Sequence, residues 1–548
     1  MSADLKKTIR RTRWHLIPAA FARLLSTALN VYLMLLIRDN LDAALKGDVG
    51  QIETVALPIV IAALLYVPLD LLSAWTKGRY LRFANQSMKG RYIDRVFKKD
   101  ISEFQGQHLA LYLSNITNDM NSIEQRYFLS LYEIMRGAFG AIGGIIILLE
   151  VHWAVAALAF IPGIVVAIVA LRSGKGLEKH EGERSDFLQQ YTIYVREVLA
   201  AFRIIRNNNL EKKVSEDFGE KSAAVQNKRF ELDKAETMVL MRNNLYFSLL
   251  IAILMVSAMM TVRSGFVTTG GVILIINGYS DIINAFYSVS ERLPLIRSER
   301  PVFSRMEEAL ENKRQDEETE DFSEFDRDLV FDKVSFSYDD NRVLHDASFT
   351  MKKGGKYMLV GPSGGGKSTV LRLIRKYFNP DEGAVLIDGE DLRYIRREAY
   401  YARLANVEQH VFLFDDSLRD NLTLYKNYSD DAILNAVREA GLSDFLSGLP
   451  EGLDHKIVDN GKNLSGGERA RIAIARGLIA KQDLLLLDEA FASLDEHVAR
   501  AIEKSLLALS GVTVISVSHV IFSDTAPLYD AIYEVKRGKI TPRTLRPA

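Results

Sequence analysis

Long apolar runs fill the first 300 residues of this 548-residue chain, and they constrain its fold more than any other feature. A helix needs about 20 predominantly apolar residues to cross the hydrocarbon core of a bilayer. Six runs approach or meet this length: 16–37, 55–75, 127–149, 153–172, 244–263 and 271–292. A single run is compatible with a buried helix of a soluble protein, whereas six in succession favour a helical membrane domain.

Lysine and arginine are unevenly distributed around these runs. They are frequent before the first run, in LKKTIRRTR, and after the second, from Lys77 to Lys99, while the segment between the two runs is net acidic. Cytoplasmic loops of membrane proteins are enriched in these residues. The sequence therefore predicts a multi-pass protein of the cell membrane with its N-terminus in the cytoplasm.

The composition argues against several other classes of protein. The formal net charge is −1, so no strong field favours nucleic acid, and we expect no nucleic-acid partner. Cysteine is absent, which excludes disulfides and thiolate sites. The nine histidines show no close metal-ligand spacing, which argues against a zinc site.

The second half of the chain has a different composition, typical of a soluble α/β domain. Between the halves lies ENKRQDEETEDFSEFDRD, residues 311–328, an acidic stretch without apolar periodicity. We expect a membrane domain over 1–300, a linker over 301–326 and a second domain over 327–548.

The segment YMLVGPSGGGKSTVLRLI reads as a buried strand, a glycine-rich turn and a helix. Glycines allow backbone N–H groups to surround phosphates at a helix N-terminus. Lys367 can reach the β- and γ-phosphates, and Ser368 can ligate Mg²⁺ with Thr369 beside it. The predicted phosphate loop consists of Gly361, Pro362, Ser363, Gly364, Gly365, Gly366, Lys367, Ser368 and Thr369.

Two further apolar strands end in residues suited to hydrolysis. LLLLDEA places Asp488 in position to hold Mg²⁺ and Glu489 as general base for the attacking water. VTVISVSH delivers His519 at a strand end, the edge where open α/β sheets bind ligands. We predict a contact between His519 and the γ-phosphate, and assign Glu489, His519 and Lys367 as the catalytic residues.

Residues 327 to 540 resemble the nucleotide-binding domain of an ATP-binding-cassette (ABC) transporter. VSFSYDDNRVLHDASF is similar to the family's first β-subdomain, and Tyr338 matches its adenine-stacking aromatic residue. Gln409 matches the glutamine that senses the γ-phosphate and the membrane domain. Asp495 matches a loop that crosses to a partner. The resemblance implies ATP and Mg²⁺, with Ser368, Gln409 and Asp488 around the metal.

A second glycine-rich turn, NLSGGE, leads into a helix without a lysine. By itself it is compatible with an ordinary helix cap. It matches the family's signature motif, which caps the ATP bound to the phosphate loop of a partner in a head-to-tail dimer. The resemblance implies that Ser465, Gly466 and Gly467 offer a hydroxyl and backbone N–H groups to that ATP. Glu468 departs from the glutamine that is more common there.

The whole chain resembles a half-transporter of the exporter type. We expect an α-helical membrane domain of six transmembrane helices, followed by an α/β P-loop NTPase domain. Segments near 102–108 and 206–213 are similar to the coupling helices of that family. Because one chain carries every catalytic motif, we favour a homodimer, and a heterodimer stays open.

The function implied by this resemblance is ATP-driven movement of an amphipathic substrate across the membrane, by alternating access coupled to ATP hydrolysis. Export of a peptide, a lipid-linked molecule or a drug-like compound is favoured. Polar residues inside spans usually face a cavity. Candidates for cavity residues are Arg23, Asn30, Asp70, Glu133, Arg136, Asn277, Tyr279, Asp281, Asn284 and Tyr287.

Other functions remain open at this point. An importer built on the same architecture is one, since fold does not fix direction. A channel or regulatory membrane protein gated by ATP is another, although the intact Glu489 argues against it. A soluble ATPase that acts on nucleic acid is disfavoured by the apolar runs and by the lack of a basic face.

Overall fold

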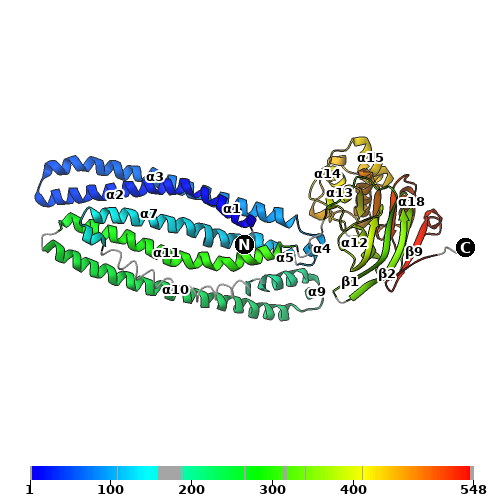
Figure 1. Ribbon diagram of the computed structural model, residues 1–548, viewed down its shortest axis with the longest axis horizontal. Helices are drawn as coiled ribbons and strands as arrows, with labels where there is room; N and C mark the ends of the chain where they lie inside the picture. The colour runs from blue at the N-terminus through cyan, green and yellow to red at the C-terminus, as the bar shows by residue number, and fades with distance from the viewer. Residues whose placement is uncertain are drawn as a thin grey trace. The chain divides into compact units, whose positions relative to one another are not determined.

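The computed structural model describes residues 3–107, 109–157, 187–188, 190–263, 267–312, 318–339, 341–409 and 411–543. It divides the chain into two compact units, Met1–Asn312 and Lys313–Ala548. The first unit is helical, and the second contains two β-sheets with helices around them (Figure 1).

Long helices dominate the first unit, and α2, α3, α7, α10 and α11 run side by side within it (Figure 1). Short helices and two π-helical turns join them. In chain order the elements are α1 (Ala3–Trp14), α2 (Leu16–Lys46), α3 (Val49–Val96), α4 (Ile101–Gln105), α5 (Leu109–Ser114), η1 (Asn115–Asp119), α6 (Met120–Ser122), η2 (Ile123–Phe128), α7 (Leu129–Leu149), α9 (Phe202–Asn207), α10 (Glu211–Arg263) and α11 (Thr269–Ala309).

The turn between α2 and α3 shows how the sequence sets helix ends. Gly47 ends α2 with φ 73°, a left-handed conformation that glycine adopts without strain. Asp48 follows as the N-cap of α3, and its carboxylate accepts a hydrogen bond from the Gln51 N–H at 3.1 Å. Gly47 and Asp48 therefore suffice to connect α2 to α3.

Glycines also bring α7 and α11 close together. A Cβ at Gly144 would lie 2.5 Å from the backbone oxygen of Gly278, so only glycine fits at this crossing. Small residues serve the same purpose in membrane helix packing, where close backbone approach provides much of the attraction.

Four described helical stretches are long and apolar enough to cross a membrane: Asp4–Lys46, Val49–Val96, Leu109–Leu149 and Thr269–Ala309. They contain the predicted spans 16–37, 55–75, 127–149 and 271–292. The predicted span 244–263 is helical within α10, and most of 153–172 lies outside the described residues. The helical membrane architecture is confirmed, and the number six stays a prediction.

A short helix, α4, overlaps the predicted coupling segment 102–108. The second predicted segment, 206–213, contains the end of α9, a short turn and the start of α10. The last helix of the first unit, α11, continues to Ala309 and therefore enters the range 301–326 that we expected to be a linker. Phe303 and Met306 are buried there, which explains why the helix continues.

The second unit contains a mostly parallel sheet and a smaller antiparallel sheet. The larger has the strand order β10-β9-β3-β8-β7-β6, and the smaller β2-β1-β4-β5. The strands are β1 (Asp328–Tyr338), β2 (Asn341–Lys352), β3 (Lys356–Val360), β4 (Glu382–Ile387), β5 (Glu390–Asp391), β6 (Leu404–Val407), β7 (Leu484–Asp488), β8 (Thr513–Val517), β9 (Ala531–Lys536) and β10 (Lys539–Pro542).

Helices surround these sheets in the second unit. They are α12 (Lys367–Ile374), α13 (Arg397–Tyr401), α14 (Leu418–Thr423), α15 (Asp430–Glu439), α16 (Ser443–Ser447), α17 (Gly466–Ala480) and α18 (Glu496–Leu507), with short 3₁₀ turns η3 (Gly452–Asp454), η4 (Asp459–Gly461) and η5 (Ala526–Leu528). Every residue of β3, β7 and β8 is buried, as expected for central parallel strands. The carboxyl ends of these three strands therefore meet at one edge of the sheet.

Candidate functional site

The phosphate loop connects β3 to α12, and its glycines are required by the backbone. Gly361 has φ 147°, and a Cβ there would lie 2.1 Å from the backbone oxygen of Val535. Gly364 and Gly366 have φ 75° and 107°, values that other residues rarely adopt. Gly366 is the N-cap of α12, and it has no side chain that could accept hydrogen bonds from the first N–H groups of this helix.

Lys367 starts α12 and is only 4% exposed. Its Nζ donates hydrogen bonds to the backbone oxygens of Gly361 and Pro362 at 3.0 and 3.1 Å. Burial lowers the pKa of Lys367, and the nearby carboxylates of Glu489 and Asp488 act in the opposite direction. Lys367 of the phosphate loop therefore lies close enough to the adjacent carboxylates Asp488 and Glu489 for their charges to act on it.

Asp488 ends β7 and is 8% exposed. Arg375, the residue after α12, donates to its carboxylate at 3.3 Å. Burial raises the pKa of Asp488, and the guanidinium of Arg375 opposes this rise. The sequence analysis missed Arg375, because nothing local marks an arginine at the end of a helix as a partner of a strand 113 residues later.

Glu489 is held on both of its carboxylate oxygens. The Gln409 amide donates to Oε2 at 2.7 Å, and His519 Nε2 lies 3.0 Å from Oε1. Glu489 itself has φ 50°, a left-handed conformation directly after the strand. Glu489 and His519, which the sequence placed at two strand ends, and Gln409, which the resemblance singled out, therefore form one cluster.

Tyr338 lies at the end of β1 among other aromatic rings. The rings of Phe336 and Phe378 meet it edge-on, with centroids 4.9 and 5.4 Å away. Arg372 of α12 donates to the Tyr338 hydroxyl at 2.9 Å. This contact ties the predicted base-stacking residue to the helix that begins with Lys367.

The signature turn has the geometry of a capping box at the start of α17. The Ser465 hydroxyl accepts a hydrogen bond from the Glu468 N–H at 3.2 Å, and the Glu468 carboxylate accepts one from the Ser465 N–H at 2.7 Å. Ser465 remains exposed, and its own O–H proton is not used in the capping box. Asp495, predicted to reach a partner, is the N-cap of α18 and accepts from the His497 N–H.

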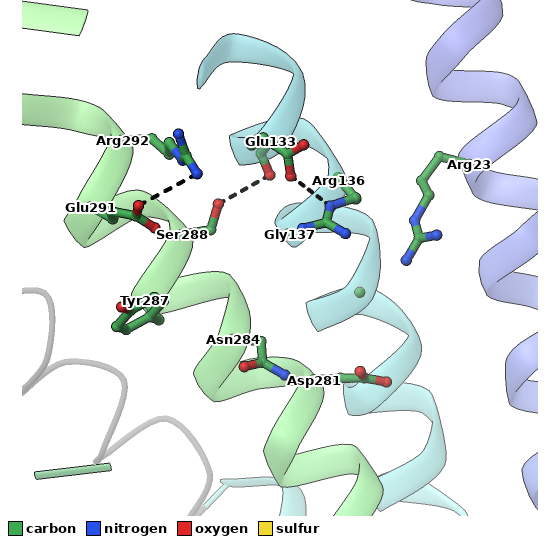
Figure 2. A pocket seen from close by; sticks show the side chains of 11 residues that line it. Arg23, Glu133, Arg136, Gly137, Asp281, Asn284, Tyr287, Ser288, Glu291 and Arg292 are labelled. Atoms are coloured by element: carbon green, nitrogen blue, oxygen red, sulfur yellow. Dashed lines mark hydrogen bonds and ion pairs between the residues drawn. The ribbon is translucent and has the colours of Figure 1, made fainter. Parts of the chain in front are cut away.

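The first unit contains a second polar cluster, in a pocket between α2, α7 and α11 (Figure 2). Six of the predicted cavity residues line it: Arg23, Glu133, Arg136, Asp281, Asn284 and Tyr287. Asn30, Asp70, Asn277 and Tyr279 are not among its lining residues. Tyr279 instead donates to the backbone oxygen of Val155 at 3.0 Å, and Asn277 to that of Ile273 at 2.9 Å.

The pocket also includes residues that the sequence analysis did not select. Ser288, Glu291 and Arg292 complete its α11 wall. Ser288 and Glu291 follow Asn284 by four and seven residues, a spacing that places all three on one helical face. That periodicity was the available signal.

Comparison with known proteins agrees with both halves of the chain. Residues 16–285 match the family model of the ABC transporter transmembrane region, and residues 344–492 match that of the ABC transporter. An ATP-dependent lipid A-core flippase of Sodalis glossinidius is 27% identical, and the match covers 96% of this chain and 92% of the relative. A protein of the same name from Haemophilus ducreyi is 26% identical over 98% of this chain and 93% of its own length.

A solved structure of a bacterial Atm1-family ABC exporter with ATP bound has the same fold. Its TM-score is 0.87 at 24% identity, and the superposition covers 96% of this chain and 94% of that one. The chain therefore belongs to the ABC transporter family, as an exporter-type half-transporter that spans the membrane several times and couples ATP binding and hydrolysis to transport.

Proposed function

We propose that the protein is a homodimeric exporter of the cell membrane with cytoplasmic ATPase domains, and that it moves an amphipathic, lipid-like substrate outward. Two relatives that match nearly the whole chain are named lipid A-core flippases, which supports a cargo with a polar head and apolar chains. The distribution of lysine and arginine supports the orientation.

The observation that carries the hydrolytic part is the cluster around Glu489. Hydrogen bonding by Gln409 and the approach of His519 fix the orientation of a carboxylate at the end of a buried strand. A general base must be positioned within hydrogen-bond reach of the water from which it takes a proton. In this proposal Glu489 accepts that proton, and His519 contacts the γ-phosphate.

The residues present fit a Mg²⁺ ion that arrives with the nucleotide. Mg²⁺ is usually held by one or two carboxylates together with phosphate oxygens and waters. The described residues contain no group of three or more acidic or histidine side chains that could hold a metal alone, and Asp488 supplies a single buried carboxylate. With Ser368 and the amide oxygen of Gln409 it would hold the ion, which would neutralise charge on the phosphates.

The remaining residues act on ATP directly. The backbone of the phosphate loop binds the phosphates, and Lys367 contributes a positive charge to them. Tyr338 provides an aromatic surface for the base. Ser465, Gly466 and Gly467 of the other subunit cover the nucleotide, so that bound ATP holds the two subunits together.

Replacement of Glu489 tests this proposal. Glu489→Gln keeps the side-chain shape but removes the base, so we expect turnover to fall by about 10²–10⁴-fold while ATP binding is retained. The control is Glu439→Gln, an exposed acid at the end of α15. ATPase activity and nucleotide affinity of the purified protein are measured together, and hydrolysis at the normal rate in Glu489→Gln would refute the assignment.

The same variant identifies cargo and direction. Small molecules and lipids are compared inside cells, at both membrane faces and in spent medium, with the native chain and with Glu489→Gln. Accumulation inside cells that carry the variant is the expected result. A compound that these cells fail to remove from the medium would establish import instead.

A further inference from the structure

The pocket in the first unit has a volume of about 380 Å³ and is lined almost entirely by polar residues and glycines. Its walls come from α2, α7 and α11 (Figure 2). This volume lies toward the lower end of the range of about 300–1,000 Å³ that small-molecule sites occupy. The pocket can therefore hold a polar head group, but not the long apolar chains of a lipid.

Most of the charges in the pocket are neutralised within the chain. Glu133 accepts from Arg136 at 2.7 Å and lies 3.7 Å from Lys77. The Arg292 guanidinium lies 3.4 Å from the Oε1 atom of Glu291. These pairs fix the upper part of the pocket in Figure 2 and leave little attraction there for a ligand.

Arg23 and Asp281 differ from these pairs. Among the residues that the structure describes, neither forms a hydrogen bond or an ion pair, and the Arg23 Nε is buried without a partner. In Figure 2 the Arg23 side chain extends from α2 toward α7, and the Asp281 carboxylate projects from α11 toward the α2 side. Polar groups at membrane depth are costly without partners, so one cation and one anion here can both gain from a ligand.

Gly140 provides the free space beside these two groups. A Cβ at Gly140 would meet no atom within 4 Å, whereas one at Gly137 would lie 3.1 Å from the Ala285 Cα. Gly137 is therefore needed for helix packing. Gly140 is not, and a larger side chain there would project into open space at the pocket wall.

We propose that this pocket binds a zwitterionic head group, with its phosphate on Arg23 and its ammonium on Asp281. The head group belongs to an amphiphile whose apolar chains lie outside the pocket. This inference rests on the proposed function, because the amphiphile would be the transported molecule. It adds the chemical class of the head group and the two residues that recognise it.

Equilibrium binding to the full-length protein in a maltoside detergent tests the proposal with three probes. Lysophosphatidylethanolamine carries the zwitterion and a chain, lysophosphatidylglycerol carries the phosphate and a chain, and phosphoethanolamine carries the zwitterion alone. We expect lysophosphatidylethanolamine to bind most tightly. If phosphoethanolamine binds equally well, the head-group chemistry stands but the ligand is a free polar solute. This result would overturn the proposal that the ligand is an amphiphile.

Each pole of the site has its own variant. Asp281→Asn should weaken the binding of lysophosphatidylethanolamine by about 10- to 100-fold, which corresponds to the loss of one charge-assisted hydrogen bond. It should also remove the preference for this probe over lysophosphatidylglycerol. Arg23→Gln should weaken the binding of both probes that carry an acyl chain. The matched controls are Arg38→Gln and Asp39→Asn, which change an ion pair of 2.8 Å on the same helix α2 outside the pocket.

Gly140→Leu tests the location without removing any charge. Its side chain should occupy the pocket and abolish binding of all three probes. Gly90→Leu is the control, because it makes the same change at an exposed helical glycine with open space around it. Retention of size-exclusion behaviour and melting temperature shows that the Gly140→Leu protein has folded.

The outcomes separate this inference from the proposed function. Unchanged probe binding in Gly140→Leu, or unchanged probe preference in Asp281→Asn, would overturn the site. Normal probe binding together with normal hydrolysis in Glu489→Gln would leave the site standing and refute the proposed hydrolytic mechanism.

Discussion

The phosphate loop Gly361–Thr369 and the signature turn Asn463–Gly467 both place glycines at a helix start, before α12 in the first case and as the first two residues of α17 in the second, but for different reasons. In the phosphate loop, Gly361 and Gly366 have positive φ, and the backbone oxygen of Val535 leaves no space for a Cβ at Gly361. In the signature turn, a Cβ at Gly466 or Gly467 would make ordinary contacts at 3.4 Å. The fold of this chain requires the first set of glycines and merely accommodates the second.

This difference indicates where each turn finds its partner. The Lys367 side chain donates hydrogen bonds to the backbone oxygens of Gly361 and Pro362 within the same loop. The signature turn has a complete capping box, an exposed Gly466, a half-buried Gly467 and no lysine, so its glycines are explained by a molecule that approaches from outside. A nucleotide bound by a second copy of the chain is such a molecule, and four predictions test this comparison.

Mixing two inactive chains should give the largest effect. Lys367→Ala damages the phosphate loop and Gly467→Asp the signature turn, so each homodimer lacks both competent sites. A mixed dimer keeps one site with both turns intact. ATPase activity should therefore appear only when the two variants are co-expressed and co-purified through different tags, and inactive mixed dimers would contradict sharing of sites between subunits.

Alanine at the two kinds of glycine should separate stability from activity. Gly361→Ala should cost at least roughly 1–3 kcal/mol through backbone strain alone, before the clash with Val535 is counted. Gly467→Ala should change stability by no more than about 0.5 kcal/mol and still reduce ATPase activity. Thermal unfolding and hydrolysis are measured on both proteins, and equal destabilisation would remove the distinction between the two turns.

Ser465 combines a cap with a proposed contact to ATP, and two substitutions separate these roles. Ser465→Ala should lose about 1 kcal/mol of stability through the missing cap. Ser465→Asp keeps an N-cap acceptor but places a negative charge toward the phosphates. We expect the aspartate variant to be as stable as the native chain and less active, and full activity would argue against the phosphate contact.

Replacing Arg375, which contacts Asp488, should shift the pH dependence of ATPase activity. Burial raises the pKa of Asp488 and Arg375 opposes this, so Arg375→Gln should raise that pKa further. Because Asp488 is proposed to act as a carboxylate, the acidic limb of the ATPase pH profile should move to higher pH. Arg471→Gln on α17 is the control, and an unshifted profile in Arg375→Gln would show that Asp488 does not set this limb.

The sequence indicated which residues lie together more completely around Glu489 than in the membrane pocket. Its phosphate-loop, strand-end and signature residues come from short segments whose spacing is set by a strand, a turn and a helix. Asp488 and Glu489 are adjacent, so their placement on one strand end needed no tertiary information. Arg375 could not be found in this way, because its contact depends on how α12 packs near β7.

In the membrane half, the sequence selected polar residues without indicating which of them meet. Arg23, Glu133 and Asp281 come from three helices that are far apart in the chain. Tyr279 and Asn277 have similar positions in the apolar pattern, yet they bond to backbone oxygens instead. Helix rotation and packing decided between these outcomes.

The sequence alone determined the two-part architecture, the apolar helices, the phosphate loop and the position of Glu489 directly after a buried strand, because these depend on local periodicity and on short motifs. Tertiary structure decided which distant groups act together. It placed Gln409 and His519 on the two oxygens of Glu489 and paired Arg375 with Asp488. It also brought Arg23 and Asp281 to one pocket, where neither forms a hydrogen bond or an ion pair with any described residue. Contacts of this kind depend on side-chain directions across separate elements, and local spacing does not specify them.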